Sequence, residues 1–585
     1  MKNKLLVGIS LLLALSCTRS NDSLWLKADV PLEGEPAYEW RILDHWDNLD
    51  DSVERGYAGP SIWEWTSQQL PSGRIDMYGA LNEKLGINGV VLNNVNASPL
   101  VLDDAHLGRV ASIADILRPH GIRVFLSVNF ASPAVLGGLP TADPLDPRVI
   151  SWWRMKVDRI HALVPDFGGF LVKASSEGQS GPQDYGRTHA DGANMLADAL
   201  APYGGIVMWR AFVYSPDNRD RAMAACDEFL PLDGTFRDNV CIQVKNGPID
   251  FQPREPFSPL FGAMEHTPLA PELQITMEYL GQSSSLVFLA PMWEEFLGSD
   301  TYRDGEGSTV SKVTTSSTLP LIAGVANIGR DPSWCGNLFN QANWYAFGRL
   351  AWNPELSSET IAEEWLRITF PKPALMGEKR FTEGFIKPML GLMLTSHGAC
   401  VDYMMPMGLH HLFAWEHHFG PEPWCDVPGA RPDWMPSYYH QAGPDGIGFD
   451  RTAATGSGAV SQYREPLAGI FESPESCPEE LLLWFHHLAW DYTLQDGRTL
   501  WDALCMHYDA GVRKAGEFCR IWKGMKPYVS RSRYRETADL LEGNLKLAQW
   551  WRDACLQYFA TFSGMPFPDG IQEPSVPLDS LMGRR

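Results

Sequence analysis

The chain of 585 residues is long enough for two or three folded units. Its composition, 44% hydrophobic and 20% charged, is that of a globular protein and argues against disorder. The formal net charge of −23 argues against nucleic acid or an anionic membrane surface as the main partner.

The first 17 residues are predicted to be an export signal. Lys2 and Lys4 precede an apolar run that ends at Cys17 and is too short to span a bilayer comfortably. Cys17 resembles the lipidated cysteine of a bacterial lipoprotein, and a cleaved signal with an incidental cysteine is the alternative. Both interpretations predict an exported protein, periplasmic or on the cell surface, and the first adds a lipid anchor. Residues 18–37 are predicted to be a polar tether.

Residues 38–360 are predicted to form a (β/α)8 catalytic barrel. Short, continuously apolar runs alternate there with stretches long enough for helices, which is typical of a parallel sheet covered on both faces. A ninth run, 286–291, follows its predecessor too closely for a parallel crossover and is interpreted as an excursion before the last strand. The predicted strands span residues 40–46, 89–94, 122–129, 169–173, 206–213, 240–245, 273–278 and 321–327.

Residues 361–585 are predicted to form a mainly α-helical C-terminal domain. Apolar side chains between Leu541 and Phe559 follow a helical spacing, and Pro478 stands near the start of another predicted helix. Ten cysteines occur in the chain, without a CxxC pair. Those beyond Cys17 are therefore interpreted mostly as buried thiols.

Charged residues gather at the predicted carboxyl ends of the barrel strands, where the active sites of such barrels lie. Structural ion pairs are the alternative for each residue, but a whole set at one rim favours a functional site. The set comprises the cations Lys173, Arg210 and Lys245 and the carboxylates Glu177, Asp250 and Glu278.

These charges predict the chemistry of the ligand. Three cations in an acidic protein indicate an anionic group on the ligand, and paired carboxylates in different surroundings are what glycoside hydrolysis needs. An acidic sugar satisfies both. Trp46, Trp209 and Trp293 could stack on it or belong to the core. The histidine pairs at 410–411 and 417–418 do not follow a metallohydrolase pattern, so neither a metal nor a cofactor is expected.

Several long segments are similar to the microbial α-glucuronidases of glycoside hydrolase family 67, and the likeness runs from about residue 38 to the end. The similar segments are residues 41–49, 54–59, 91–96, 169–179, 244–255 and 410–418. The resemblance implies a (β/α)8 catalytic domain and a helical C-terminal domain that often mediates dimerisation, which makes a homodimer one candidate assembly.

The implied reaction is exo-acting hydrolysis with inversion. It removes glucuronic acid, or its 4-O-methyl ether, from an α-1,2 bond to the terminal xylose of xylo-oligosaccharides. By this resemblance Glu177 is the acid, and Asp250 and Glu278 share the position of the base. The implied substrate-binding residues are Lys173, Arg210 and Lys245 for the uronic acid, Trp46 and Val95 near the sugar and its methoxy group, and Trp424 or Trp434 as a platform for xylose.

Members of the family usually carry a further N-terminal domain, and the short segment between Cys17 and residue 38 leads us to expect that this chain lacks it. The competing function is a lipoprotein that captures acidic oligosaccharides without cleaving them. The presence of both an acid and a base favours the hydrolase, because a pure binder has no need of them.

Overall fold

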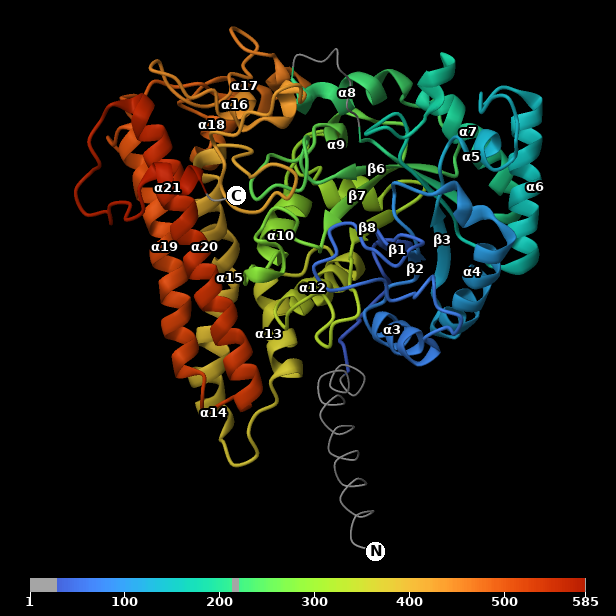
Figure 1. Ribbon diagram of the computed structural model, residues 1–585, viewed down its shortest axis with the longest axis horizontal. Coiled ribbons are helices and arrows are strands. Elements are labelled where there is room, and N and C mark those ends of the chain that lie inside the picture. Colours follow the sequence, from blue (N-terminus) through green and yellow to red (C-terminus); the bar gives the residue numbers. More distant parts are fainter. Residues whose placement is uncertain (1–28, 213–219, 584–585) are drawn as a thin grey trace, which may run out of the picture.

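The computed structural model describes residues 29–212 and 220–583, and a closed barrel of eight parallel strands forms its core (Figure 1). The predicted export signal lies outside the described residues. Each strand pairs with its neighbours in sequence, and β1 closes the ring against β8. The predicted fold class is therefore confirmed. The strands are β1 (Trp40–Asp44), β2 (Gly89–Val91), β3 (Arg123–Ser127), β4 (Gly169–Val172), β5 (Ile206–Arg210), β6 (Val240–Lys245), β7 (Leu269–Gln274) and β8 (Leu321–Val325).

The seventh strand lies earlier in the chain than the predicted range 273–278. In the structure Glu272 of β7 is opposite Lys245 of β6 and Ala323 of β8. Pro271 stands in the middle of this strand, and a proline without an N–H group argues against a central strand when only the sequence is read. The correction puts Glu272 inside the barrel and moves Glu278 into the loop that follows β7.

Helices cover the outside of the barrel. In α6 (Pro147–Leu163), Val149, Trp153, Val157 and Ile160 repeat at helical spacing and are buried, so one face of the helix packs inward. Its first turn is capped by Asp146. The surrounding helices are α3 (Ser72–Lys84), α4 (Asp104–Leu117), α5 (Ser132–Val135), α6 (Pro147–Leu163), α7 (His189–Leu200), α8 (Ala224–Phe229), α9 (Leu260–Ala263), α10 (Ala290–Gly298), α11 (Val310–Thr315) and α12 (Asn340–Trp352).

Residues 29–37, which the sequence places in the tether, lie against the end of α12. The Ala37 amide donates to the carbonyl of Trp352 (2.9 Å), and the Trp352 indole donates to the carbonyl of Glu33 (3.0 Å). This part of the chain is thus attached to the barrel.

The C-terminal region is mainly helical, as predicted. The predicted helix 541–559 falls within α20 (Arg531–Ser563), where Leu541 and Phe559 are buried. The predicted helix after Pro478 is present but short: a 3-10 turn over Glu479–Leu481 leads into α18 (Leu482–Phe485). Three long helices, α15, α19 and α20, stand together beside the barrel (Figure 1). The helices are α13 (Ser358–Thr369), α14 (Glu378–Phe381), α15 (Lys387–Met404), α16 (Pro436–His440), α17 (Leu467–Glu472), α18 (Leu482–Phe485), α19 (Leu500–Gly524), α20 (Arg531–Ser563) and α21 (Leu578–Met582).

A fully buried ion pair joins the two parts. Arg451 donates to Asp220, which follows the β5 strand, with an Nε–Oδ2 distance of 2.7 Å. The guanidinium group also lies over the rings of Phe449 and Trp484. This contact fixes the segment between α15 and α19 over the carboxyl end of the barrel.

The cysteines of the described residues are free thiols, and all except the half-buried Cys519 are buried. The prediction that most are buried thiols is confirmed. Within the described ranges, no helix has the length and apolar character needed to cross a membrane.

Candidate active site

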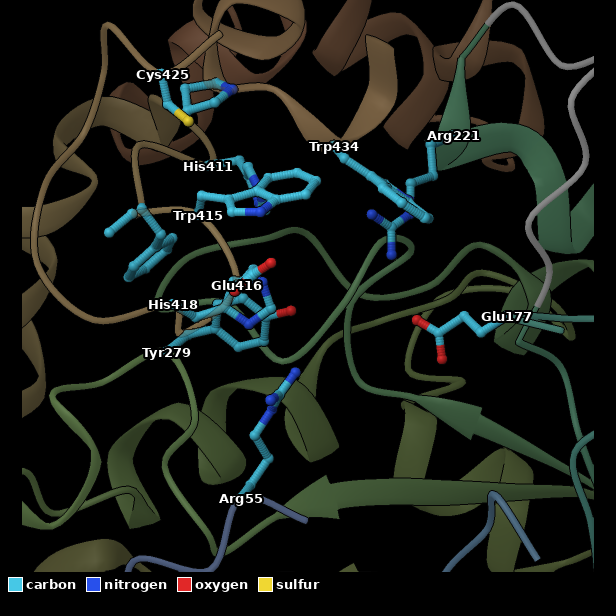
Figure 2. Close-up of a pocket in the computed structure, with 13 residues that line it drawn as sticks. Arg55, Glu177, Arg221, Tyr279, His411, Trp415, Glu416, His418, Cys425 and Trp434 are labelled. Carbon is cyan, nitrogen blue, oxygen red and sulfur yellow. The ribbon is translucent and has the colours of Figure 1, made fainter. Parts of the chain in front are cut away.

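A cavity of about 210 Å³ lies between the mouth of the barrel and the segment 411–436 of the C-terminal region. In Figure 2 the carboxyl group of Glu177 points into it from one side, and Arg55, Tyr279 and His418 lie on the other. Its lining residues are Arg55, Glu177, Arg221 and Tyr279 from the barrel and His411, Phe413, Ala414, Trp415, Glu416, His418, Cys425, Trp434 and Pro436 from the C-terminal region.

Glu177 stands in the loop after β4. The backbone is left-handed at both Ser175 and Glu177 (φ 55° and 48°), a conformation that costs energy for residues with side chains and that clusters at functional sites. The ammonium group of Lys173 donates to the Glu177 carboxylate and to the side-chain oxygen of Asn96 (2.8 Å). The Glu177 side chain is 38% exposed whereas Lys173 is buried. Burial lowers the pKa of Lys173, and the Glu177 charge opposes that effect.

Asp250 lies in the loop after β6 and is held by several donors. Lys245 donates to its Oδ1 (2.5 Å), as does the Phe251 amide (2.9 Å), and the Tyr279 hydroxyl donates to its Oδ2 (2.7 Å). Burial alone would raise the pKa of Asp250, but the charges of Lys245 and Arg221 outweigh it and hold the pKa well below its usual range. Asp250 is therefore ionised.

Glu278, in the loop after β7, is ionised for a similar reason. Its Oε1 accepts from Arg55 Nε (2.6 Å) and lies 2.8 Å from His418 Nδ1, while its Oε2 accepts from Gln274 (3.1 Å). Burial raises the pKa of Glu278, but the hydrogen bond and charge of His418 and the charge of Arg55 lower it below the ordinary value.

Arg210, at the end of β5, forms a buried ion pair with Glu272 of β7. The Nη2–Oε1 distance is 2.7 Å and the Nε–Oε2 distance is 3.1 Å. Burial works against the charge of the guanidinium group, but Glu272 raises the pKa of Arg210 above its ordinary value. Inside the same barrel, burial and then the charge of Glu272 raise the pKa of Asp44 to about 8. Arg210 was identified from the sequence because it is a charged residue within an apolar run. Glu272 carries the same signal but was not identified.

Trp46 and Val95 are both buried near the barrel mouth, and neither is among the described residues that line the cavity. The guanidinium carbon of Arg210 lies 5.9 Å from the centre of the Trp46 ring. The structure therefore brings Trp46 next to one of the predicted cations but not into the lining of the cavity. The fully buried Trp209 and Trp293 belong to the core.

Of the two proposed xylose platforms, only Trp434 lines the cavity. Trp424 instead packs edge-on against Tyr558 of α20, with ring centres 6.0 Å apart. Trp415, which the sequence prediction did not include, also lines the cavity, 6.1 Å from Trp434 between ring centres. The tryptophans that line the cavity are therefore Trp415 and Trp434.

The residues that hold the predicted carboxylates were also missed. Arg55 and His418 lie in segments that carry the family resemblance, but only the fold shows that both reach Glu278. Glu54 accepts hydrogen bonds from the side chains of Asn94 and Asn96 (2.9 Å each) and so supports the partner of Lys173. Among the described residues, no group of three or more His, Cys, Asp or Glu side chains could hold a metal ion.

The chain is similar in sequence to known proteins over most of its length. The sequence matches the model of the glycosyl hydrolase family 67 middle domain over residues 26–334 and that of the family's C-terminus over residues 335–572. It is 41% identical over 562 residues to alpha-glucuronidase A of Emericella nidulans, covering 92% of this chain and 64% of that protein. It is 40% identical over 548 residues to the alpha-glucuronidase of Hypocrea jecorina, covering 91% and 63%. The chain thus spans less than two thirds of the length of these relatives.

Proposed function

The chain belongs to glycosyl hydrolase family 67, and we propose that it is an inverting α-glucuronidase. The proposed substrates are xylo-oligosaccharides whose terminal xylose carries α-1,2-linked glucuronic acid or 4-O-methyl-glucuronic acid. One observation carries the proposal: a partly exposed carboxyl group, Glu177, faces a cavity wall whose side chains contact two buried, ionised carboxylates, Asp250 and Glu278.

In the proposed reaction Glu177 donates a proton to the glycosidic oxygen as the bond between that oxygen and the anomeric carbon breaks. Asp250 or Glu278 removes a proton from a water molecule, whose oxygen forms the new bond to the anomeric carbon from the opposite face. The cations around both carboxylates favour the ionised form that a base requires. Inversion also requires roughly 6.5–9.5 Å between acid and base, which leaves room for the water.

The anionic end of the sugar is assigned to Lys173, Arg210 and Lys245. A uronate carboxylate that binds Lys173 competes with Glu177 for the same ammonium group, so binding would release Glu177 to act on the leaving oxygen. Trp46 and Val95 would border the sugar and its methoxy group. The xylose part would extend toward Trp434.

The test is incubation of the whole protein with aldotetraouronic acid, followed by chromatography for the released uronic acid and by proton NMR of the first anomer formed. We expect release of the uronic acid, first as the β-anomer because an α-linkage is inverted. No release between pH 5 and 8 despite measurable binding would favour the oligosaccharide-capturing lipoprotein. An α-anomer as first product would contradict inversion.

We also propose that the protein is exported and anchored through Cys17, and that it forms a homodimer through the C-terminal region. Replacing Cys17 by Ser should move the protein from the membrane fraction to the soluble fraction of the producing cells. An unchanged membrane fraction would contradict the anchor. Light scattering of the purified protein tests the dimer.

A further inference from the structure

One aromatic ring lies beside all three cations of the proposed uronate site. Phe212 stands two residues after β5 and is 9% exposed. Its ring centre is 3.8 Å from Lys245 Nζ, 5.0 Å from Lys173 Nζ and 5.3 Å from the guanidinium carbon of Arg210. Each distance is within the range over which the face of an aromatic ring attracts a cation.

Three cations buried so close together repel one another, so nearby groups must compensate their charges. Burial lowers the pKa of Lys173 and Lys245, and the charge of Arg210 lowers both further. Carboxylates compensate part of this cost, since Lys173 pairs with Glu177, Lys245 with Asp250 and Arg210 with Glu272. Two of those carboxylates, however, are the proposed acid and one proposed base, and they must change partner or protonation during the reaction.

An aromatic ring compensates charge in a different way. Its negative face attracts a cation without accepting a strong N–H hydrogen bond, so the N–H groups remain available to a carboxylate. A ring shared by three cations therefore keeps them together before substrate arrives and still leaves donors for the uronate.

We propose that Phe212 is a positioning and specificity-determining residue, whose ring holds Lys173, Arg210 and Lys245 as one preformed site for the sugar carboxylate. This inference rests on the proposed function. It assigns uronate selectivity jointly to the cations and to the ring that organises them.

The test compares variants that keep or remove the ring. Phe212→Leu and Phe212→Met keep an apolar side chain without the aromatic face, whereas Phe212→Tyr keeps the face. With aldotetraouronic acid, we expect the ringless variants to raise KM about tenfold while kcat changes less than about threefold, and Phe212→Tyr to stay within about twofold of the parent KM. The inhibition constant of free glucuronic acid should rise in parallel with KM.

Phe370→Leu is the matched control, because its ring lies 5.4 Å from the guanidinium carbon of Arg533, outside the proposed site. Its KM should remain that of the parent, and thermal unfolding of each variant reports on folding. Parent-like KM in a folded ringless variant, or equal weakening in Phe212→Leu and Phe212→Tyr, would overturn the role of the ring. Failure of the parent protein to release uronic acid would instead overturn the proposed function, so the two failures are distinguishable.

Discussion

Glu177 differs from the other two carboxylates of the site in its surroundings. Asp250 and Glu278 are buried and held by several donors, whereas Glu177 is partly exposed and has Lys173 as its charged partner. A group that must lose and regain a proton in each cycle needs that access, while a base that must stay ionised needs fixed cations.

Replacing Glu177 by Gln should leave binding of aldouronic acids largely intact and reduce kcat by about 1,000-fold, within the range attributed to general acid catalysis. The matched control is Glu295→Gln, on α10, whose carboxylate pairs with Arg254 at the surface. Its kcat should equal that of the parent. Steady-state kinetics measures both, and near-parent turnover by Glu177→Gln would remove Glu177 from the acid role.

The buried ion pair between Arg210 and Glu272 should affect the stability of the fold when one partner is replaced. Glu272→Gln removes one charge and leaves a buried guanidinium group without the carboxylate it pairs with, which should lower the free energy of unfolding by about 3–5 kcal/mol. Glu363→Gln, which breaks the exposed pair with Arg367 on α13, should cost less than about 1 kcal/mol. Urea denaturation monitored by tryptophan fluorescence measures both, and similar losses in the two variants would contradict the argument.

At the scale of the element, the backbone of the loop after β6 is held in place by a side chain of the same loop. The carboxyl group of Glu255 accepts hydrogen bonds from the amides of Ile249 (2.8 Å) and Asp250 (3.0 Å). A side chain at Gly247 would meet this carboxyl group, because a Cβ atom added there would lie 2.4 Å from Glu255 Oε2. Glu255 and Gly247 thus set the path of the backbone that carries Asp250.

The buried Asp44 on strand β1 should also make the stability of the protein depend on pH. Burial raises the pKa of Asp44, on β1, to about 8, far above its ordinary value near 4. Between these values the folded protein holds a proton that the unfolded chain releases, so the free energy of unfolding falls as pH rises from about 5 to 8. Asp44→Asn should flatten this fall, whereas Asp115→Asn, on the exposed face of α4, should not. Thermal unfolding across that pH range measures the slope, and an unchanged slope in Asp44→Asn would contradict it.

How far the sequence predicts these elements depends on how local the signal is. Continuous apolar runs located β1 to β6 and β8 to within a few residues, because a buried parallel strand is apolar on both faces. Because Pro271 argues against a strand, the sequence did not predict the true bounds of β7 or the position of Glu272 within it. The contact of Arg55 with Glu278 joins residues far apart in sequence, and the choice of Trp434 over Trp424 depends on how the C-terminal region returns to the barrel. No local pattern contains that information.

At the scale of the whole molecule, the C-terminal region supplies part of the barrel's chemistry. His418 contacts Glu278 and stacks on Tyr279, with ring centres 4.6 Å apart. A barrel separated from this region would therefore keep Glu278 but lose one of the groups that hold it ionised.

His418→Ala should raise the pKa of Glu278 toward that of a buried carboxyl group, since His418 opposes the effect of burial. If Glu278 is the base, the acidic limb of the pH profile of kcat/KM moves to higher pH, because the base must be ionised to act. We expect this shift. An unmoved limb in a folded variant would assign the base to Asp250. The control is His417→Ala, whose side chain is exposed and whose backbone carbonyl accepts from Gln282.

The division of the site between two regions has a consequence for biosynthesis. A chain that leaves the ribosome N-terminus first completes its last barrel strand at Val325, long before His418 and Trp434 have been made. Until that later segment is made and anchored by Arg451 against Asp220, the nascent chain contains Glu177, Asp250 and Glu278 but lacks the side chains that form the other wall of the cavity. Formation of the complete cavity therefore depends on synthesis of the second half of the chain, and we expect a chain that ends before His418 to be inactive.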